Sequence, residues 1–220
     1  MAHEVLARID DISEFLQDQS AEAEQLGRLP DATAKKLRES GLMRMLQPKE
    51  YGGYEAHPNE FLEAVMATGK HDPATGWIAG VVGVHPWETA MNDDKLQNEL
   101  WSEDQDAWMA SPYAPMGMAI PTEGGYILNG RWSFSSGTDH CNWLVIGALV
   151  GDADGKPAMP FLSLHVMVPR PDYTIIEDSW NVLGLQGTGS KDVVVEGAFI
   201  PDYRAIDAAK EINGTAYKES

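Results

Sequence analysis

Two ring-bearing residues, Trp77 and His85, stand eight positions apart in the apolar stretch that follows Asp72-Pro73. Eight residues make about two turns of an α-helix, so on one continuous helix the indole and the imidazole lie on the same side. An imidazole titrates near neutral pH and can accept or donate a phenolic proton. The same spacing also fits a core tryptophan beside a core histidine bonded to a carbonyl, and both interpretations stay open on spacing alone.

A second candidate is Ser111, in Ala110-Ser111-Pro112 at the end of the strand expected over residues 107–111. A hydroxyl at a strand end, with its neighbouring amide, suits hydrogen bonding to the edge of a heterocycle. The alternative is an ordinary Ser–Pro turn.

A third candidate follows Asn129-Gly130, the strongest local hairpin signal in the chain. Alternation beyond that turn places Trp132 and Phe134 on one strand face and Ser135 on the other, and Ser136 stands where the strand breaks. The alternative is an ordinary amphipathic hairpin.

The segment from Trp180 to Ser190 combines glycines with hydroxyl side chains. Its backbone amides could approach a ligand such as a phosphate. It is not a dinucleotide fingerprint, because no βαβ unit follows it, and it lacks the lysine of a P-loop.

The elements that must position these residues change character after Trp101. Before it, apolar residues recur at helical spacing between Gly and Pro breaks, and Pro86 should kink the apolar helix that carries Trp77. After it, short strand-like runs alternate with turns, which favours an antiparallel sandwich or barrel. We therefore predict an α+β protein with an all-α helical domain (1–105), a β-domain (106–205) and a linker or the start of a further helix (206–220).

Composition narrows the function classes. The formal net charge is −18 and Lys and Arg are scattered, which argues against nucleic-acid backbones and anionic membranes as partners. Cys141 is the only cysteine, so no internal disulfide forms and a reducing cytoplasm is expected. The histidines are not at metal-ligand spacing, so we expect no metal site. The N-terminus has no apolar run, and we expect a soluble protein.

In their order along the chain, these segments resemble the acyl-CoA dehydrogenase superfamily. The segment GLMRMLQPKEYGG is similar to that family's helix-to-loop element. Within the superfamily the chain looks most like two-component flavin-dependent monooxygenases that hydroxylate phenols such as p-hydroxyphenylacetate or a phenolic seco-steroid. The similar stretches are HDPATGWIAGVVGVHPWETA, WMASPYAP, GGYILNGRWSFSSGTDHCNW and SWNVLGLQGTGSKDVVVEGAFIP.

The resemblance implies a mechanism and assigns roles. Reduced FMN or FAD, supplied by a separate flavin reductase, would react with O2 to a C4a-hydroperoxide that hydroxylates a small aromatic substrate. Trp77 and His85 would bind the substrate, and His85 and Ser136 would be catalytic. The positions implied for cofactor binding are Ala110, Ser111, Trp132, Ser135 and Ser136, with Trp132 flanking the flavin ring.

The family normally continues into a C-terminal four-helix bundle that closes the flavin pocket and supports a homo-oligomer. The sequence stops at Ser220, about where that bundle should begin. We therefore expect weak flavin binding and little turnover from this chain by itself.

Two other functions stay open. The first is an acyl-CoA dehydrogenase with tightly bound FAD, although Ala114–Gly117 stands in place of that enzyme's acidic Gly-Ser-Asp loop. The second is a non-catalytic remnant that pairs with a separately encoded helical partner.

Overall fold

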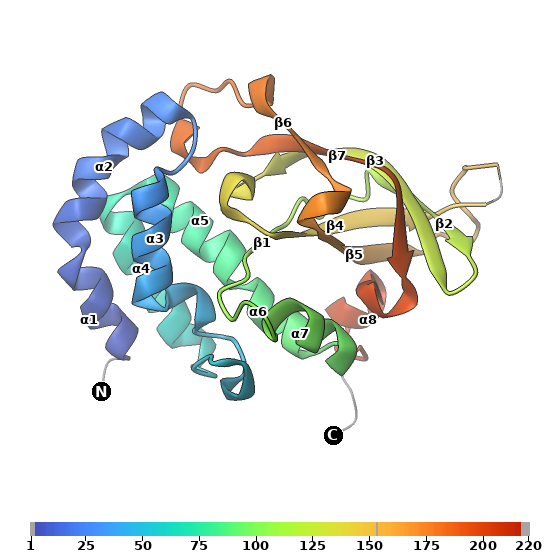
Figure 1. Cartoon of the computed structure of the whole chain (residues 1–220), viewed down its shortest axis with the longest axis horizontal. Coiled ribbons are helices and arrows are strands. Elements are labelled where there is room, and N and C mark those ends of the chain that lie inside the picture. The colour runs from blue at the N-terminus through green and yellow to red at the C-terminus, as the bar shows by residue number, and fades with distance from the viewer. Residues whose placement is uncertain (1–2, 153, 217–220) are drawn as a thin grey trace.

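Helices precede a sheet in the computed structural model, which describes residues 3–152 and 154–216 (Figure 1). The helical half lies to one side of the sheet, and α6 and α7 continue beneath it. The helices are α1 (Glu4–Asp11), α2 (Ser13–Leu26), α3 (Asp31–Ser40), α4 (Pro58–His71), α5 (Pro73–Gly83), α6 (His85–Ala90), α7 (Asp94–Trp101) and α8 (Ala208–Ile212).

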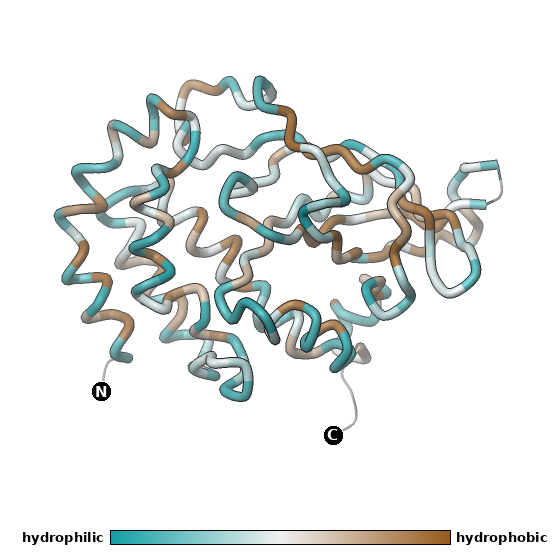
Figure 2. The backbone as a smooth tube through the Cα atoms, viewed as in Figure 1, coloured by the Kyte–Doolittle hydropathy of each residue, from teal (hydrophilic) through white to brown (hydrophobic). Residues whose placement is uncertain are grey.

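The first two helices are amphipathic. Figure 2 shows hydrophobic and hydrophilic stretches alternating along α1 and α2, and Val5, Ile9 and Leu16 are buried. Burial of one apolar stripe, rather than intrinsic propensity, supplies most of the stability of such helices.

The helix that carries Trp77 is central and interrupted. Asp72 caps α5 by accepting a hydrogen bond from the Thr75 amide at 2.9 Å, and Pro73 occupies the first turn. α5 ends at Gly83, and α6 starts at His85 with Pro86 in its first turn. Proline lacks the amide hydrogen that would continue α5. The break between α5 and α6 confirms the predicted kink. Trp77 and His85 therefore stand on two successive helices.

The strands form one sheet in the order β6-β7-β3-β2-β4-β5-β8, with β1 beside β4. Their bounds are β1 (Met109–Ala110), β2 (Gly117–Thr122), β3 (Gly125–Ser135), β4 (Trp143–Val150), β5 (Ser163–Pro169), β6 (Thr174–Ile176), β7 (Lys191–Pro201) and β8 (Ala205–Asp207). This arrangement confirms the predicted helical half followed by a β half.

The sheet is mixed rather than purely antiparallel. β1 and β2 both run parallel to β4, and the other pairings among the described residues are antiparallel. β3 and β4 flank β2, so the short connection between Ser135 and Trp143 passes the end of β2 and brings β4 in parallel to it. The alternation of strand-like runs and turns in the sequence does not indicate that the connection from β3 to β4 crosses the end of β2.

The hairpin predicted at Asn129-Gly130 is wrong. Both residues lie inside β3, and the actual turn is Glu123-Gly124, where Thr122 pairs with Gly125 and Gly124 has φ +76°. Position 130 requires glycine for another reason, because a Cβ there would lie 2.6 Å from the Trp132 ring. Glycine is needed at this point so that an indole can lie across the strand.

The hydrophobic core is continuous across the two halves. One cluster contains Ile78 and Val82 of α5 together with Leu144 and Ile146 of β4. The helical half ends at Trp101 and the first strand begins at Met109, close to the predicted boundary between residues 105 and 106. The division into domains at 1–105, 106–205 and 206–220 stays a prediction.

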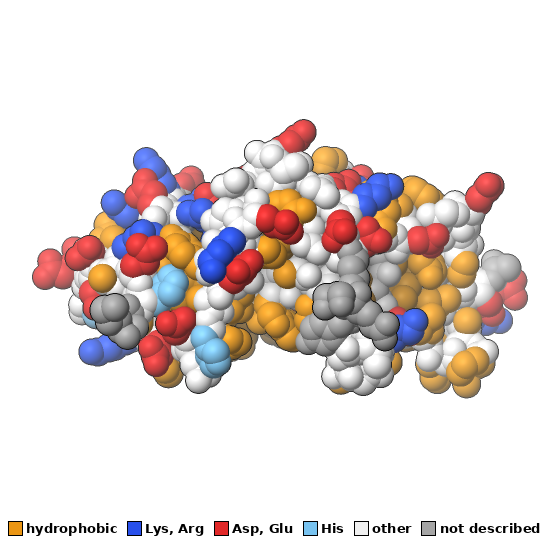
Figure 3. Space-filling view, turned by 90° about the horizontal axis from the view of Figure 1, so that it is seen from below, with side chains coloured by type: hydrophobic (Ala, Val, Ile, Leu, Met, Phe, Trp, Pro, Cys, Tyr) orange, Lys and Arg blue, Asp and Glu red, His pale blue; other side chains and the backbone are white. Residues whose placement is uncertain are grey.

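The predicted tail begins with the end of β8 and the short helix α8, whereas residues 217–220 lie outside the described part. No described helix is long and apolar enough to cross a membrane. On the face shown in Figure 3, Lys and Arg side chains are interspersed with Asp and Glu.

Candidate active site

A cavity of about 190 Å³ lies where α5 and α6 meet the sheet. Four of the predicted site residues line it, namely Trp77, His85, Ser111 and Ser136. Its lining consists of Trp77, Val81, Val84, His85, Ser111, Tyr113, Phe134 and Ser136. Helical and sheet residues that are distant in sequence therefore share one mostly apolar space, as a small-molecule site requires.

Ser136, directly after β3, connects the helical wall to the segment directly before β7. The indole Nε1 of Trp77 donates a hydrogen bond to its Oγ at 3.0 Å. The same oxygen is 2.7 Å from the Oγ of Ser190, which is 2.7 Å from the Oγ1 of Thr188. This chain of hydroxyls fixes the Ser136 side chain at the cavity wall.

A second cavity of about 200 Å³ adjoins the first and shares Trp77, Phe134 and Ser136 with it. Its other walls come from the glycine-containing loop between Trp180 and Ser190. The prediction that this loop approaches a ligand thus has a geometric basis. However, the amides of Gln186 and Gly187 face the Glu24 carboxylate at 3.3 and 3.4 Å, so these two donors are already engaged.

Phe134 reaches the site because β3 is irregular. Pairing with β7 shifts between Trp132 and Ser135, which is a β-bulge, and Phe134 has φ +64°. The bulge breaks the alternation, so Phe134 is 70% exposed while Trp132 is fully buried. The prediction that Trp132 and Phe134 share a face is therefore wrong.

Three residues implied as cofactor contacts have side chains that do not line either cavity. Trp132 lies in the core, where its Nε1 donates to the Gly147 carbonyl at 2.7 Å. Ala110 and Ser135 are fully buried as well. Trp132 thus has no free ring face to flank a flavin, and of Trp132 and Phe134 only Phe134 lines the cavities.

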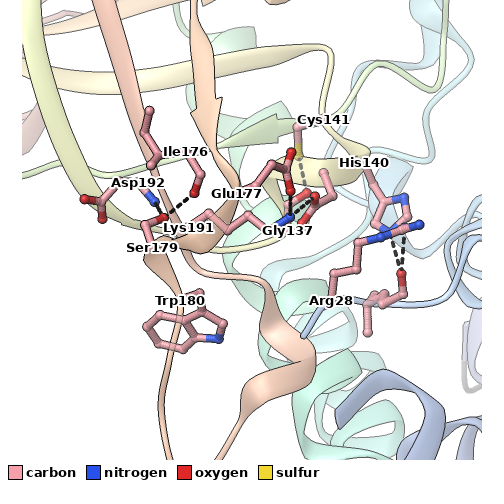
Figure 4. Close-up of polar contacts among 12 residues, drawn as sticks. Arg28, Gly137, His140, Cys141, Ile176, Glu177, Ser179, Trp180, Lys191 and Asp192 are labelled. Carbon is pink, nitrogen blue, oxygen red and sulfur yellow. Dashed lines mark hydrogen bonds and ion pairs between the residues drawn. The ribbon is translucent and has the colours of Figure 1, made fainter. Parts of the chain in front are cut away.

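The turn after Ser136 is anchored from several sides (Figure 4). Lys191 at the start of β7 donates to Asp139 and to Glu177, both at 2.6 Å. His140 lies 2.8 Å from the carbonyl of Leu29, at the start of the α3 segment. These contacts tie the turn after Ser136 to β7 and to the helical half.

His85 sits in a buried polar network. Its Nδ1 is 2.9 Å from Glu88 Oε2 and 3.0 Å from the Tyr113 hydroxyl, and Tyr113 donates to Glu88 at 2.5 Å. Burial would raise the pKa of the Glu88 carboxyl, but hydrogen bonds from His165, His85 and Tyr113 outweigh it and hold that pKa well below its usual range. Burial and the neighbouring carboxylate raise the pKa of Tyr113.

His165 extends the network to α8. Its Nδ1 is 2.5 Å from Glu211 Oε2 and 3.3 Å from Glu88 Oε1. Burial lowers its pKa, but the two carboxylates prevail and raise it to about 9. The side chains of Glu88, His165 and Glu211 are close enough to share a metal ion. A protonated His165 already supplies a positive charge between the carboxylates, so the cluster needs no cation to be stable.

Sequence reasoning missed Glu88, Tyr113 and the convergence of His165 with them. Glu88 had a detectable signal, because it stands three residues after His85 and such pairs are neighbours on a helix. Tyr113 and His165 had none, because only the tertiary fold brings the segment after β1 and strand β5 to α6.

Comparisons with known proteins show which proteins this chain is similar to. Residues 6–93 match the family model "Acyl-CoA dehydrogenase, N-terminal domain". The chain is 55% identical over its whole length to the pigment production hydroxylase of Rhodococcus erythropolis, covering 56% of it. Over 96% of its length it is 42% identical to the flavin-dependent monooxygenase oxygenase subunit HsaA of Rhodococcus jostii, covering 54% of that protein.

Solved structures show the same relationship. The crystal structure of the 3-HSA hydroxylase from Rhodococcus sp. RHA1 superposes with TM-score 0.92 and 41% identity, over 98% of this chain and 54% of that one. XiaF from Streptomyces sp., solved with FADH2 and glycerol, gives TM-score 0.89 and 30% identity, over 94% and 52%. The chain thus spans about half the length of the relatives it matches.

The helical half of the chain thus matches the N-terminal domain of acyl-CoA dehydrogenases, and the whole chain has the fold of the 3-HSA hydroxylase. Its homologues are oxygenase subunits of flavin-dependent monooxygenases, which are oxidoreductases.

Proposed function

We propose that this chain forms the substrate-facing part of the oxygenase component of a two-component, reduced-flavin-dependent monooxygenase that hydroxylates a phenolic substrate. The observation that carries the proposal is the single cavity lined by Trp77, His85, Ser111 and Ser136. Relatives named for the hydroxylation of resorcinol and p-hydroxyphenylacetate support the phenolic class.

The residues present fit a flavin. Two adjoining cavities with aromatic walls meet at Phe134 and Ser136, and the imidazole of His85 keeps a buried Nε2 without a partner among the described residues. Ser111 and Ser136 would hold the edge of the ring through their hydroxyls, and Phe134 would contact its face. When bound, reduced FMN or FAD supplies the oxygen chemistry together with O2.

The chain's own residues orient the substrate and exclude water. His85 accepts the phenolic proton, which raises electron density at the ring carbons ortho to the oxygen. Trp77 and Val81 provide an apolar wall beside it. A dry site of this kind strengthens each hydrogen bond inside it and suppresses loss of reactive species to water.

The proposal includes partners. The name "oxygenase subunit" of the relatives implies a second component, a flavin reductase that delivers reduced flavin. A homo-oligomer of the whole protein belongs to the same proposal. The single buried thiol of Cys141 supports action in a reducing cytoplasm.

The experiment is a set of titrations of the ¹⁵N-labelled chain, read from the tryptophan indole N–H signals. Phenol and anaerobically reduced FMN or FAD should shift the Trp77 signal, even if binding is weak, and leave the buried Trp101 unchanged. Shifts confined to other tryptophans would overturn the assignment of this cavity.

An acyl-CoA dehydrogenase-like function is the second candidate, and the family match of the helical half favours it. The named relatives that match the whole chain are monooxygenases and hydroxylases, which favours the first. An acyl-CoA added to the same labelled chain separates the two: a shift of Trp77 with acyl-CoA but not with phenol would favour the dehydrogenase.

A further inference from the structure

We propose that Glu88 is a positioning residue that holds His85 in the Nδ1–H tautomer, so that Nε2 is the atom that accepts a hydroxyl proton from the ligand. The inference rests on the proposed function, because it specifies how His85 would recognise a phenol. It assigns a role to a buried carboxylate that neither the sequence nor the comparisons single out.

The geometry around Nδ1 determines which nitrogen carries the proton. Glu88 is 5% exposed and offers Oε2 to Nδ1 at 2.9 Å. The Tyr113 hydroxyl has one proton and donates it to the same carboxylate at 2.5 Å, so toward His85 it can only accept. Nδ1 therefore faces two acceptors and must be the donor.

The second nitrogen is left as an acceptor. A neutral imidazole carries a single N–H, so a proton on Nδ1 leaves a lone pair on Nε2. Nε2 is buried and has no partner among the described residues, and the ring borders the cavity of about 190 Å³. A buried acceptor without a hydrogen-bond donor is unfavourable, and a hydroxyl proton donated by a ligand to Nε2 would satisfy it.

The local fold makes this arrangement rigid. His85 and Glu88 are three residues apart on α6, so one helical turn fixes their separation. Tyr113 packs edge-on against the imidazole with ring centroids 5.6 Å apart. On the far side of Glu88, His165 lies 3.3 Å from Oε1, which keeps the carboxylate in place.

The test is the tautomeric state of His85, read from the ¹⁵N shifts of its ring nitrogens in the full chain at a pH where the ring is neutral. We expect a protonated Nδ1 and an unprotonated Nε2 in the wild type. Glu88→Gln replaces the carboxylate by a weaker acceptor and should raise the Nε2–H population several-fold. Tyr113→Phe is the matched control, because the carboxylate remains and the tautomer should not change.

A wild-type protein with the proton on Nε2 would overturn the proposal without any variant. An unchanged tautomer in folded Glu88→Gln would also overturn it.

A second arm separates this inference from the proposed function. Phenol and its methyl ether anisole have similar rings, but only phenol has a hydroxyl proton. We expect phenol to shift the Nε2 signal and anisole to leave it nearly unchanged. If Glu88→Gln alters the tautomer while neither probe shifts Nε2, Glu88 still positions His85, and the phenolic function fails. If anisole shifts Nε2 as strongly as phenol, Nε2 does not act as the proton acceptor.

Discussion

The indole Nε1 of Trp77 on α5 donates a hydrogen bond at 3.0 Å to the Oγ of Ser136, at the end of β3. This bond joins the helical and sheet walls of the cavity. Ser136→Ala removes the acceptor of Trp77 and a partner of Ser190, and should lower the free energy of unfolding by about 1–2 kcal/mol. Urea denaturation measures the change.

The neighbouring serine is the control for that substitution. Ser135 is fully buried, but its Oγ has no hydrogen-bond partner among the described residues. Ser135→Ala should therefore leave stability unchanged or raise it slightly. Equal losses from both substitutions would show that the hydroxyl chain through Ser136 contributes nothing specific.

The positive φ of Phe134 predicts that, of two variants truncated at this position, the glycine variant is more stable than the alanine variant. Both Phe134→Ala and Phe134→Gly remove the ring, which packs against Trp180 with centroids 5.9 Å apart. In an ordinary strand alanine is the more stable of the two by about 0.5–1 kcal/mol. At φ +64° the Cβ costs about 1–2 kcal/mol, so here the glycine variant should be more stable.

Thermal unfolding of the two proteins decides this point. An alanine variant as stable as the glycine variant, or more so, would mean that the bulge relaxes once the ring is gone. The strain would then come from the contacts of Phe134 rather than from the pairing of β3.

Much of the helical half was predictable because its signals are local. Asp72 and Pro73 stand together at the start of α5, and Pro86 ends its continuation, so the start and the kink follow from residue chemistry alone. The convergence of Trp77, His85, Ser111 and Ser136 was predictable through the resemblance, not through spacing.

The β half was harder because its determinants are tertiary. Asn129-Gly130 has the composition of a turn, yet Gly130 pairs with Gly117, and the Trp132 indole lies across both glycines. Gly130 is a glycine because the Trp132 ring leaves no room for a Cβ. The sequence alone does not distinguish such a glycine from one that forms a turn. Trp132 is buried and Phe134 is exposed because of the bulge in β3, which strand alternation in the sequence does not predict.

Close approach of α4 and α5 makes two glycines of α5 respond differently to alanine. A Cβ on Gly76 would lie 2.3 Å from the Cα of Gly69, a backbone atom that cannot move aside. Gly76→Ala should therefore destabilise by about 1–3 kcal/mol. A Cβ on Gly80 would meet Val65 at 3.4 Å, an ordinary contact, and helix propensity should make Gly80→Ala neutral or stabilising by up to about 1 kcal/mol.

Chemical denaturation of both alanine variants in parallel checks this pair. Indifference of Gly76→Ala would contradict the direct contact of the two helix backbones.

Lys191 should matter far more than one of its two partners. It is 6% exposed and lies between the largely buried Asp139 and the exposed Glu177. Lys191→Met leaves the Asp139 carboxylate buried without its cation and should cost about 3–5 kcal/mol. Glu177→Gln removes an exposed partner and should cost less than about 1 kcal/mol.

Denaturation of the two variants at one pH and salt concentration gives the comparison. A small effect of Lys191→Met would mean that Asp139 finds another partner or becomes protonated. The anchoring of the turn after Ser136 would then depend on other contacts.

Because of His165, we expect the free energy of unfolding to decrease as the pH rises above neutrality. Its pKa is raised to about 9 in the folded chain, above the ordinary value of 6.5, because the Glu211 and Glu88 carboxylates outweigh burial. A group whose pKa is raised by folding contributes stability that is fully present below its unfolded pKa and is lost as the pH rises through the folded value. The free energy of unfolding should therefore fall by about 1–3 kcal/mol between about pH 6.5 and about pH 9.5.

Urea denaturation across that pH range measures the loss, and His165→Gln isolates its source. The variant should be less stable than the wild type near neutral pH, and its stability should fall less over the interval because the proton of His165 is no longer lost. A wild-type slope that persists unchanged in His165→Gln would assign the titration to another group and would leave Glu88 without a cationic neighbour on the side of Oε1.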